Sequence, residues 1–174
     1  MDGATGAHIR SVTTGINNPS ALTTDGTHLW VGNSGDNSVA ELNLSDGSLV
    51  RVVSGPSYQF AAPQAMASDG SHLWVVSLNN DTVTELNLSD GSFAGLITND
   101  PSTSCAISAP YAAVSDGTHL WVGGDGNGDV NEIDPTTDTC TQVATVVSGG
   151  GVDALAWDGS HLWATDTYNS QSVL

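Results

Sequence analysis

The sequence predicts an all-β fold, a β-propeller in which four repeats each form a sheet of four antiparallel strands. A phrase of the form Asp-Gly-Thr/Ser-His-Leu-Trp occurs four times, and successive copies start 44, 47 and 42 residues apart. Repeats of about 40 to 50 residues that hold several short strands are typical of propeller blades. No stretch of the 174-residue chain has apolar residues at the spacing of an amphipathic helix.

The first repeat illustrates how one unit of sequence forms one blade. "PSALTTDG" predicts an innermost strand that ends in a tight turn at Asp25-Gly26, because Gly accepts positive φ. "THLWVGN" and "SVAELNL" predict the second and third strands, with side chains alternating between two faces. "LVRVVSG" predicts the outermost strand. The same order recurs, so we expect blades at residues 19–55, 63–100 and 110–149.

The two ends of the chain hold the parts of a fourth blade. Residues 152–174 supply its inner strands, and residues 7–15 resemble the outermost strand of the first repeat, with Arg10 at the position of Arg51. We expect this N-terminal strand to complete blade 4, because a strand shared between the ends removes a sheet edge. The exchange would occur within one chain, giving a four-bladed ring, or between copies, giving a larger ring or a filament. The third possibility is that the chain is a segment of a longer repeat array.

Trp and His recur at fixed positions of the repeat. A Trp ring wedged between neighbouring blades buries roughly 150 to 250 Å2, so we expect the Trp residues to hold the blades together; stacking on sugars is the alternative. The second strand does not line the central channel, so we expect the His residues to bond to turns or neighbouring blades rather than to form a metal ring. The Trp residues are Trp30, Trp74, Trp121 and Trp163, and the His residues are His28, His72, His119 and His161.

One segment, "GDGNGDVNE", is the best local candidate for a metal site. Asp125, Asn127 and Asp129 alternate along it and Asn131 continues the series, as oxygen ligands do in calcium loops. These residues are therefore candidate calcium ligands, and a Gly-rich hairpin turn is the competing explanation. The sequence contains no Ser-His-Asp or Gly-x-Ser-x-Gly signature, so it indicates no catalytic residues and no cofactor besides calcium.

Three carboxylates recur on the third strand, and they are Glu41, Glu85 and Glu132. A polar residue of the second strand is expected opposite each of them. We therefore expect cross-strand bonding rather than acid–base catalysis.

The composition limits the partners and the location. The chain has 19 acidic and two basic residues, with a net charge of −17. Nucleic acids and anionic membranes are bound through Lys and Arg, so we expect neither as a partner. No apolar run approaches the 18 residues of a membrane span. Abundant Gly, Ser, Thr and Asn in a strand-rich chain suit an exported protein, so we expect an extracellular or cell-surface location.

Two further features agree with export. Cys105 and Cys140 are the only cysteines, and in an oxidising compartment a disulfide between them is expected unless the two lie on opposite faces. Asn43, Asn80 and Asn87 each begin an N-glycosylation acceptor sequence. The acceptor pattern is short and also occurs by chance.

The stretch "DGTHLWVGNSGDNSVAELNLSDGSLV" resembles bacterial propellers of the YVTN and NHL-like kind and the relatives of virginiamycin B lyase. They share an Asp-Gly turn, a Leu-Trp strand, an Asn-rich turn and a strand that ends in Glu-Leu-Asn. The resemblance implies a propeller, and these families include enzymes, sensors and surface binding modules. Their members usually carry six or seven blades, whereas this chain has four repeats. No catalytic His or metal position of the lyase matches residue by residue.

We therefore expect a secreted or surface-displayed propeller that acts as a binding, structural or self-assembling module without catalysis. Its partners would be protein or carbohydrate at the cell surface, or copies of itself joined by strand exchange. A lyase- or lactonase-like enzyme with a metal-dependent site at the channel mouth is one alternative. A lectin-like carbohydrate-binding propeller is the other.

Overall fold

The computed structural model of the chain describes residues 3–99, 105, 107–126, 128–145, 150–167 and 172–173. These residues form antiparallel sheets whose strands follow one another in sequence order. The first sheet contains β1 (Pro19–Thr24), β2 (His28–Asn33), β3 (Ser38–Asn43) and β4 (Leu49–Val53). The second contains β5 (Pro63–Ser68), β6 (His72–Ser77), β7 (Thr82–Asn87) and β8 (Phe93–Thr98). The third contains β9 (Pro110–Ser115), β10 (Leu120–Gly124), β11 (Asp129–Asp134) and β12 (Thr139–Thr145), and the fourth contains β13 (Leu155–Trp157), β14 (Leu162–Asp166) and β15 (Ser172–Val173).

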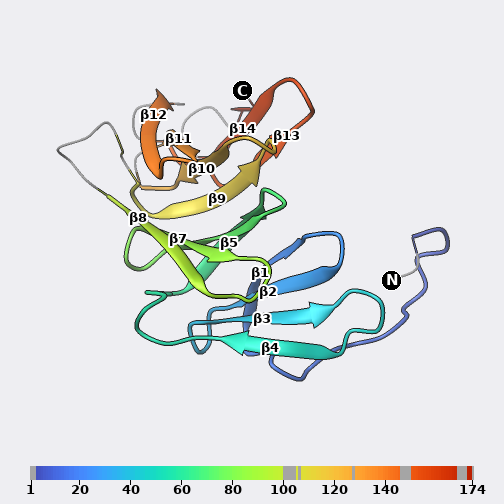
Figure 1. The fold of residues 1–174 in the computed structure, drawn as a ribbon. Coiled ribbons are helices and arrows are strands. Elements are labelled where there is room, and N and C mark those ends of the chain that lie inside the picture. The colour runs from blue at the N-terminus through green and yellow to red at the C-terminus, as the bar shows by residue number, and fades with distance from the viewer. Residues whose placement is uncertain are drawn as a thin grey trace.

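The sheets are arranged like successive blades of a propeller, with the inner strands β1, β5, β9 and β13 adjacent in that order (Figure 1). The Ser20 hydroxyl of β1 donates a hydrogen bond to the carbonyl oxygen of Pro63 in β5, which joins two inner strands directly. The sheets do not close into a ring. No helix in the described ranges has the length and apolar character needed to cross a membrane.

The turn between the first two strands of each sheet is built from the repeated Asp-Gly pair. Gly26 has φ of 91° and Gly70 has φ of 93°, a conformation that glycine adopts without steric cost. The Asp25 carboxylate accepts hydrogen bonds from the backbone N–H groups of Thr27 and His28, both at 2.7 Å. The turn therefore satisfies its own backbone donors and sets the register of the second strand.

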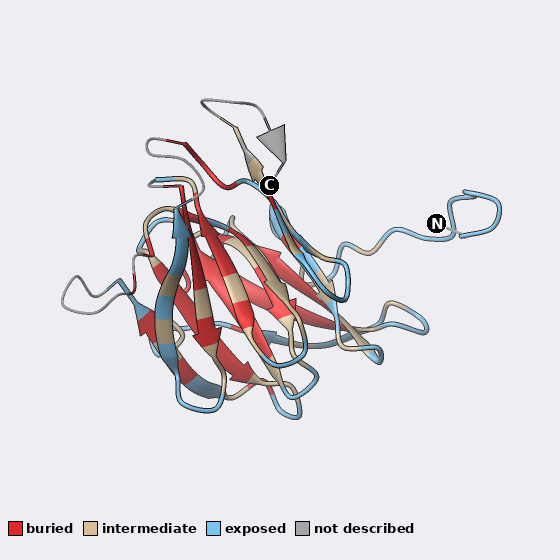
Figure 2. Ribbon diagram, turned by 90° about the horizontal axis from the view of Figure 1, so that it is seen from above, coloured by how far each residue is buried: buried red, intermediate tan, exposed pale blue. Residues whose placement is uncertain are grey.

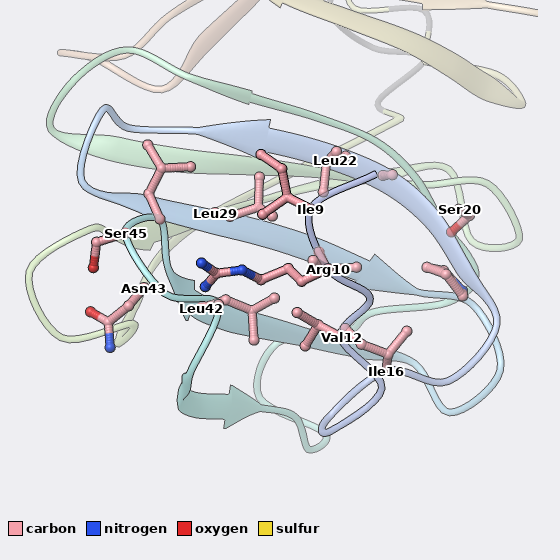
Figure 3. Close-up of a pocket in the computed structure, with 15 residues that line it drawn as sticks. Ile9, Arg10, Val12, Ile16, Ser20, Leu22, Leu29, Leu42, Asn43 and Ser45 are labelled. Carbon is pink, nitrogen blue, oxygen red and sulfur yellow. The ribbon is translucent and has the colours of Figure 1, made fainter. Parts of the chain in front are cut away.

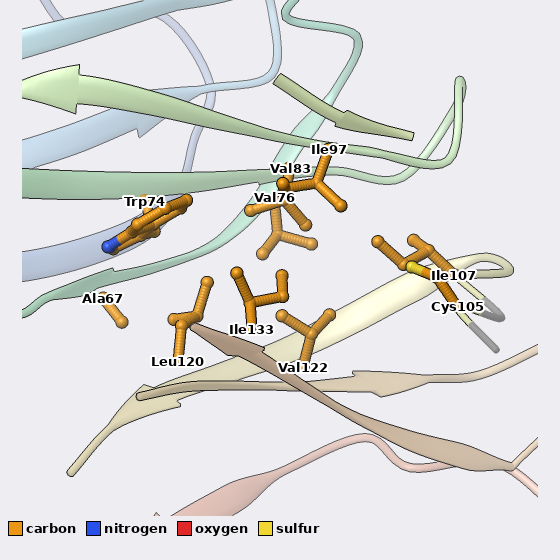
Figure 4. Packing of buried hydrophobic residues seen from close by; sticks show 10 residues of the cluster. All are labelled: Ala67, Trp74, Val76, Val83, Ile97, Cys105, Ile107, Leu120, Val122 and Ile133. Atoms are coloured by element: carbon orange, nitrogen blue, oxygen red, sulfur yellow. The ribbon is translucent and has the colours of Figure 1, made fainter. Parts of the chain in front are cut away.

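The core lies between consecutive sheets, where the central strands are buried on both faces (Figure 2). Trp74 of β6 is fully buried and packs against the third sheet, near Leu120, Val122 and Ile133 (Figure 4). Trp30 occupies the same place between the first and second sheets. Each of these Trp side chains thus acts as a wedge that joins its own sheet to the next one.

The N-terminal segment, residues 7–15, differs from its predicted place. It forms no strand, and it lies across the free face of the first sheet rather than at the edge of the fourth. Val12 and the following Ile16 pack against Leu29, Val31 and Leu42 of that sheet. The N-terminal segment therefore does not complete blade 4 within one chain. Its apolar side chains cover the first sheet instead, and the first and fourth sheets do not meet.

Cys105 and Cys140 are joined by a disulfide with an S–S distance of 2.06 Å. The bond ties the connection that precedes β9 to the outer strand β12. Cys105 also belongs to the apolar cluster around Trp74. The covalent link therefore reinforces the junction between the second and third sheets.

We expect Trp74→Ala to lower the free energy of unfolding by about 3 to 5 kcal/mol, because it leaves a cavity between two sheets. Val143→Ala is the control, since that side chain is 46% exposed on β12 and a surface substitution changes stability by about 0.5 kcal/mol or less. Urea unfolding of both variants gives the two values. If both variants lost the same free energy of unfolding, the Trp74 side chain would not be what holds the two sheets together.

Loss of the disulfide should also destabilise the chain. The bonded cysteines are 35 residues apart, and closing a loop of that length stabilises a fold by about 3 to 4 kcal/mol in the chain-entropy model. Urea unfolding of the double variant Cys105→Ala, Cys140→Ala measures the loss. Adding a reducing agent should affect the parent chain and leave the variant unchanged, and an effect on both would point to another cause.

Candidate functional site

The repeated Asp, His and Trp side chains form one local network in each of the four repeats. In the first, the Asp25 carboxylate accepts a hydrogen bond from the Trp30 indole N–H at 2.9 Å, and the His28 Nδ1 lies 3.4 Å from the same oxygen. The second repeats this at Asp69, with the Trp74 indole at 3.0 Å. The Asp residue therefore fixes both the turn and the Trp wedge.

A buried glutamate extends the network in the first sheet. Glu41 is fully buried, and its carboxylate lies 3.3 Å from His28 Nδ1 and 2.6 Å from Arg51 Nε. Burial raises the pKa of Glu41, and the positive charges of Arg51 and His28 oppose that rise. His28 thus bonds to its turn and to the third strand of its own sheet.

The second sheet has the same glutamate without the arginine. Glu85 Oε1 lies 3.2 Å from His72 Nδ1, and Gly95 stands at the position that Arg51 occupies in the first sheet. A methyl group on Gly95 would lie 2.7 Å from Glu85 Oε2 and 3.3 Å from a carboxylate oxygen of Asp138, in the turn between β11 and β12. Burial raises the pKa of Glu85, and the nearby Asp138 charge adds to the rise.

The network is more exposed in the third and fourth repeats. Burial alone would raise the pKa of Asp116, but hydrogen bonds from the backbone of His119 and Thr118 and from the Trp121 indole outweigh it and lower the pKa to about 2. In the fourth repeat, the Trp163 indole N–H donates to Asp158 at 2.8 Å, and this bond is the main cause of the lowered pKa of Asp158. The four networks thus share one geometry and differ in burial.

The candidate calcium ligands do not converge in the part of the chain that the structure describes. Asp129 accepts a hydrogen bond from the Thr145 hydroxyl at 2.7 Å. Asp125 lies near Asp153 instead, and burial and the Asp125 charge raise the pKa of Asp153. Asn127 lies outside the described residues. Within the described ranges no group of three His, Cys, Asp or Glu side chains is placed to hold a metal ion. Calcium binding stays a prediction.

The acceptor asparagines for glycosylation lie at strand ends and in a turn. The side-chain amides of Asn43 and Asn87 each donate to a serine hydroxyl of the next turn, at 2.7 and 2.9 Å. The Asn80 amide is exposed and donates to the carbonyl oxygen of Gln59 at 2.7 Å. Modification of any of them stays a prediction.

An apolar groove of about 720 Å3 lies on the free face of the first sheet (Figure 3). Leu22, Leu29 and Leu42 line its floor, and residues 9–16 form one wall. The wall contributes the Arg10 side chain, which extends over the groove. Leu22 is 63% exposed, so the groove presents aliphatic surface to solvent. Sequence reasoning missed this site because it placed the N-terminal segment elsewhere.

The arrangement of the sheets defines the chain as a protein with a β-propeller fold. No family model matches it, and no curated protein matches it. Among solved structures, hydrazine synthase from Kuenenia stuttgartiensis matches 92% of this chain with a TM-score of 0.70 and 20% identity. An inactive variant of virginiamycin B lyase from Staphylococcus aureus, solved with quinupristin, matches 90% with a TM-score of 0.67 and 17% identity. The propeller of a nidogen/laminin complex matches 85% with a TM-score of 0.66 and 12% identity.

These neighbours support the fold and leave the activity open. The chain spans between 44% and 56% of the length of these three structures. They include an enzyme and a protein in complex with another protein, so the fold is compatible with several functions.

We expect Gly95→Arg to have a free energy of unfolding at pH 7 about 1 kcal/mol higher than Gly95→Gln, because it places a cation between two carboxylates. Both substitutions require the Glu85 carboxylate to shift, since a Cβ on Gly95 would lie 2.7 Å from Glu85 Oε2. The raised pKa of Glu85 means that its ionisation costs the folded state free energy as the pH rises through that pKa. The gain should therefore shrink as the pH falls and Glu85 is protonated. Urea unfolding at several pH values measures it.

Gly95→Gln is the matched control, since its amide reaches as far as the Arg Nε, the atom that contacts Glu41 in the first sheet, and carries no charge. A gain that is equal for Arg and Gln, or independent of pH, would contradict the electrostatic explanation.

Proposed function

We propose that the chain is an exported, non-catalytic binding module that holds a protein partner in the apolar groove of the first sheet. The groove carries this proposal, because its floor is a sheet face whose counterparts in the second and third sheets are covered by another sheet. Exposed apolar surface of this kind is typical of protein interaction sites.

The character of the groove favours protein over carbohydrate. Leu22, Leu29, Val31 and Leu42 are aliphatic, whereas sugar sites combine aromatic faces with polar side chains. Trp30 and Trp74 are fully buried and offer no surface to a sugar ring, and Trp163, which is 45% exposed, does not line the groove.

The repeated ionisable residues support a structural role for the most conspicuous motif. The His28, Asp25 and Glu41 side chains bond to one another and to Trp30 and Arg51. The bonds of Asp69 to His72 and Trp74, and of His72 to Glu85, recur in the second sheet, which has no arginine at this site. Hydrogen bonds that orient a wedge between sheets account for these residues without a reaction.

Two observations favour export. The Cys105–Cys140 disulfide suits an oxidising compartment. The strongly acidic, lysine-free composition suits a surface that stays soluble outside the cell.

The dye anilinonaphthalene sulfonate tests the groove directly. At low protein concentration we expect its fluorescence to rise on addition of the chain, because apolar surface and the Arg10 guanidinium suit an apolar anion. Leu22→Asp should remove most of this rise, and Val143→Asp, on a different exposed surface, should not. Equal fluorescence from all three proteins would show that the groove is not a binding surface. Turnover of a lactone or an ester that a chelator abolishes would favour the enzyme instead.

A further inference from the structure

The free face of the first sheet reproduces the surface that receives a Trp wedge elsewhere in the chain. Trp30 packs on the second sheet in a cluster that includes Met66, Leu73, Val75 and Leu86. The residues 44 positions earlier in the sequence are Leu22, Leu29, Val31 and Leu42. All four line the groove. The first sheet therefore has a receiving surface, and no Trp of the described residues occupies it.

The fourth sheet carries the matching wedge. The Trp163 ring is 45% exposed, whereas Trp30 and Trp74 are fully buried. Its indole is held by Asp158 in the same way as the others, so the side chain is already oriented. The fourth sheet also has three strands in the described ranges, and no outermost strand pairs with β15 there.

The N-terminal segment stands where the outermost strand of a preceding blade would stand. A methyl group on Gly47 would lie 2.9 Å from Cγ2 of Val12 and 3.4 Å from Cδ of Arg10. A methyl group on Gly91 would lie 3.0 Å from Cγ2 of Val53 and 3.3 Å from Cδ of Arg51. Val53 and Arg51 belong to β4, the outermost strand of the sheet before Gly91. Val12 and Arg10 thus contact the first sheet as β4 contacts the second.

These three features fit one occupant, the fourth sheet of another copy. We propose that two copies of the chain associate head to tail, with the Trp163 face of one fourth sheet in the groove of the partner's first sheet. The partner's N-terminal segment would then lie beside β15, where the described residues place no further strand. This deepens the proposed function, since it names the partner of the groove as a second copy.

A pair of copies, rather than an open series, would match the length of the neighbours. The hydrazine synthase and virginiamycin B lyase structures share the fold, and this chain covers 44% and 54% of them. Proteins that share this fold are therefore known at about twice the length of this chain. Two head-to-tail contacts related by a two-fold axis close two copies into a ring.

Size-exclusion chromatography with light scattering over a range of concentrations tests the proposal on the purified chain. We expect the mass to rise from 17.7 kDa to twice that value. Leu22→Asp and Trp163→Asp should each weaken association by about 30-fold or more, as expected for the centre of an interface. Val143→Asp should leave it unchanged. Circular dichroism checks that each variant is folded, which the exposure of Leu22 and Trp163 favours.

Mixing the two monomeric variants gives the most specific result. In a mixed pair one contact carries both substitutions, and the other contact carries neither. We therefore expect the mixture to form dimers although each variant alone stays monomeric. A mixture that stays monomeric would overturn the head-to-tail arrangement.

Other outcomes would also overturn it. A parent chain that is monomeric at every concentration excludes association, and dimers of both single variants place the contact elsewhere. Neither result removes the proposed binding role, because dye binding at the groove is measured separately. Dye binding that declines as the protein concentration rises would agree with both proposals.

Discussion

The hydrogen bond between a turn carboxylate and a Trp indole is the interaction on which the architecture depends. Asp25 and Asp69 satisfy the backbone donors of their turns with one oxygen and hold the indole with the other. A Trp ring without that partner would bury an unpaired N–H between two sheets, which costs free energy. The Asp residue therefore makes the largest side chain of the repeat compatible with complete burial, and each Trp can then join two sheets.

The buried glutamates of the first two sheets differ in the charges beside them. Only the first sheet has an arginine beside its buried glutamate, and the equivalent site in the second sheet is a glycine facing two carboxylates. With two basic residues in the whole sequence, most buried carboxylates have hydrogen bonds and histidines as their partners. Hydrogen bonds from backbone and indole N–H groups stabilise the ionised form of the turn aspartates, whereas burial raises the pKa of Glu41 and Glu85.

Most of the fold was predictable because the repeat fixes its local structure. The Asp-Gly turns, the Trp positions and the strand order follow from short-range sequence signals. The place of residues 7–15 was not predictable, because the segment resembles an outermost strand and yet pairs with no sheet. A strand needs a partner edge, and whether such an edge lies within reach depends on how far successive sheets rotate. The groove was missed for the same reason, since it exists only where the segment leaves the first sheet uncovered.

The burial of the wedges declines along the chain, from complete at Trp30 and Trp74 to partial at Trp121 and least at Trp163. In a protein built from units that touch only their neighbours, local stability follows the quality of each junction. The molecule is therefore most cohesive around its second sheet and loosest at its C-terminal sheet. Opening fluctuations should begin at that end and travel inward, so the amide protons of β13 and β14 would exchange with solvent long before those of β6 and β7.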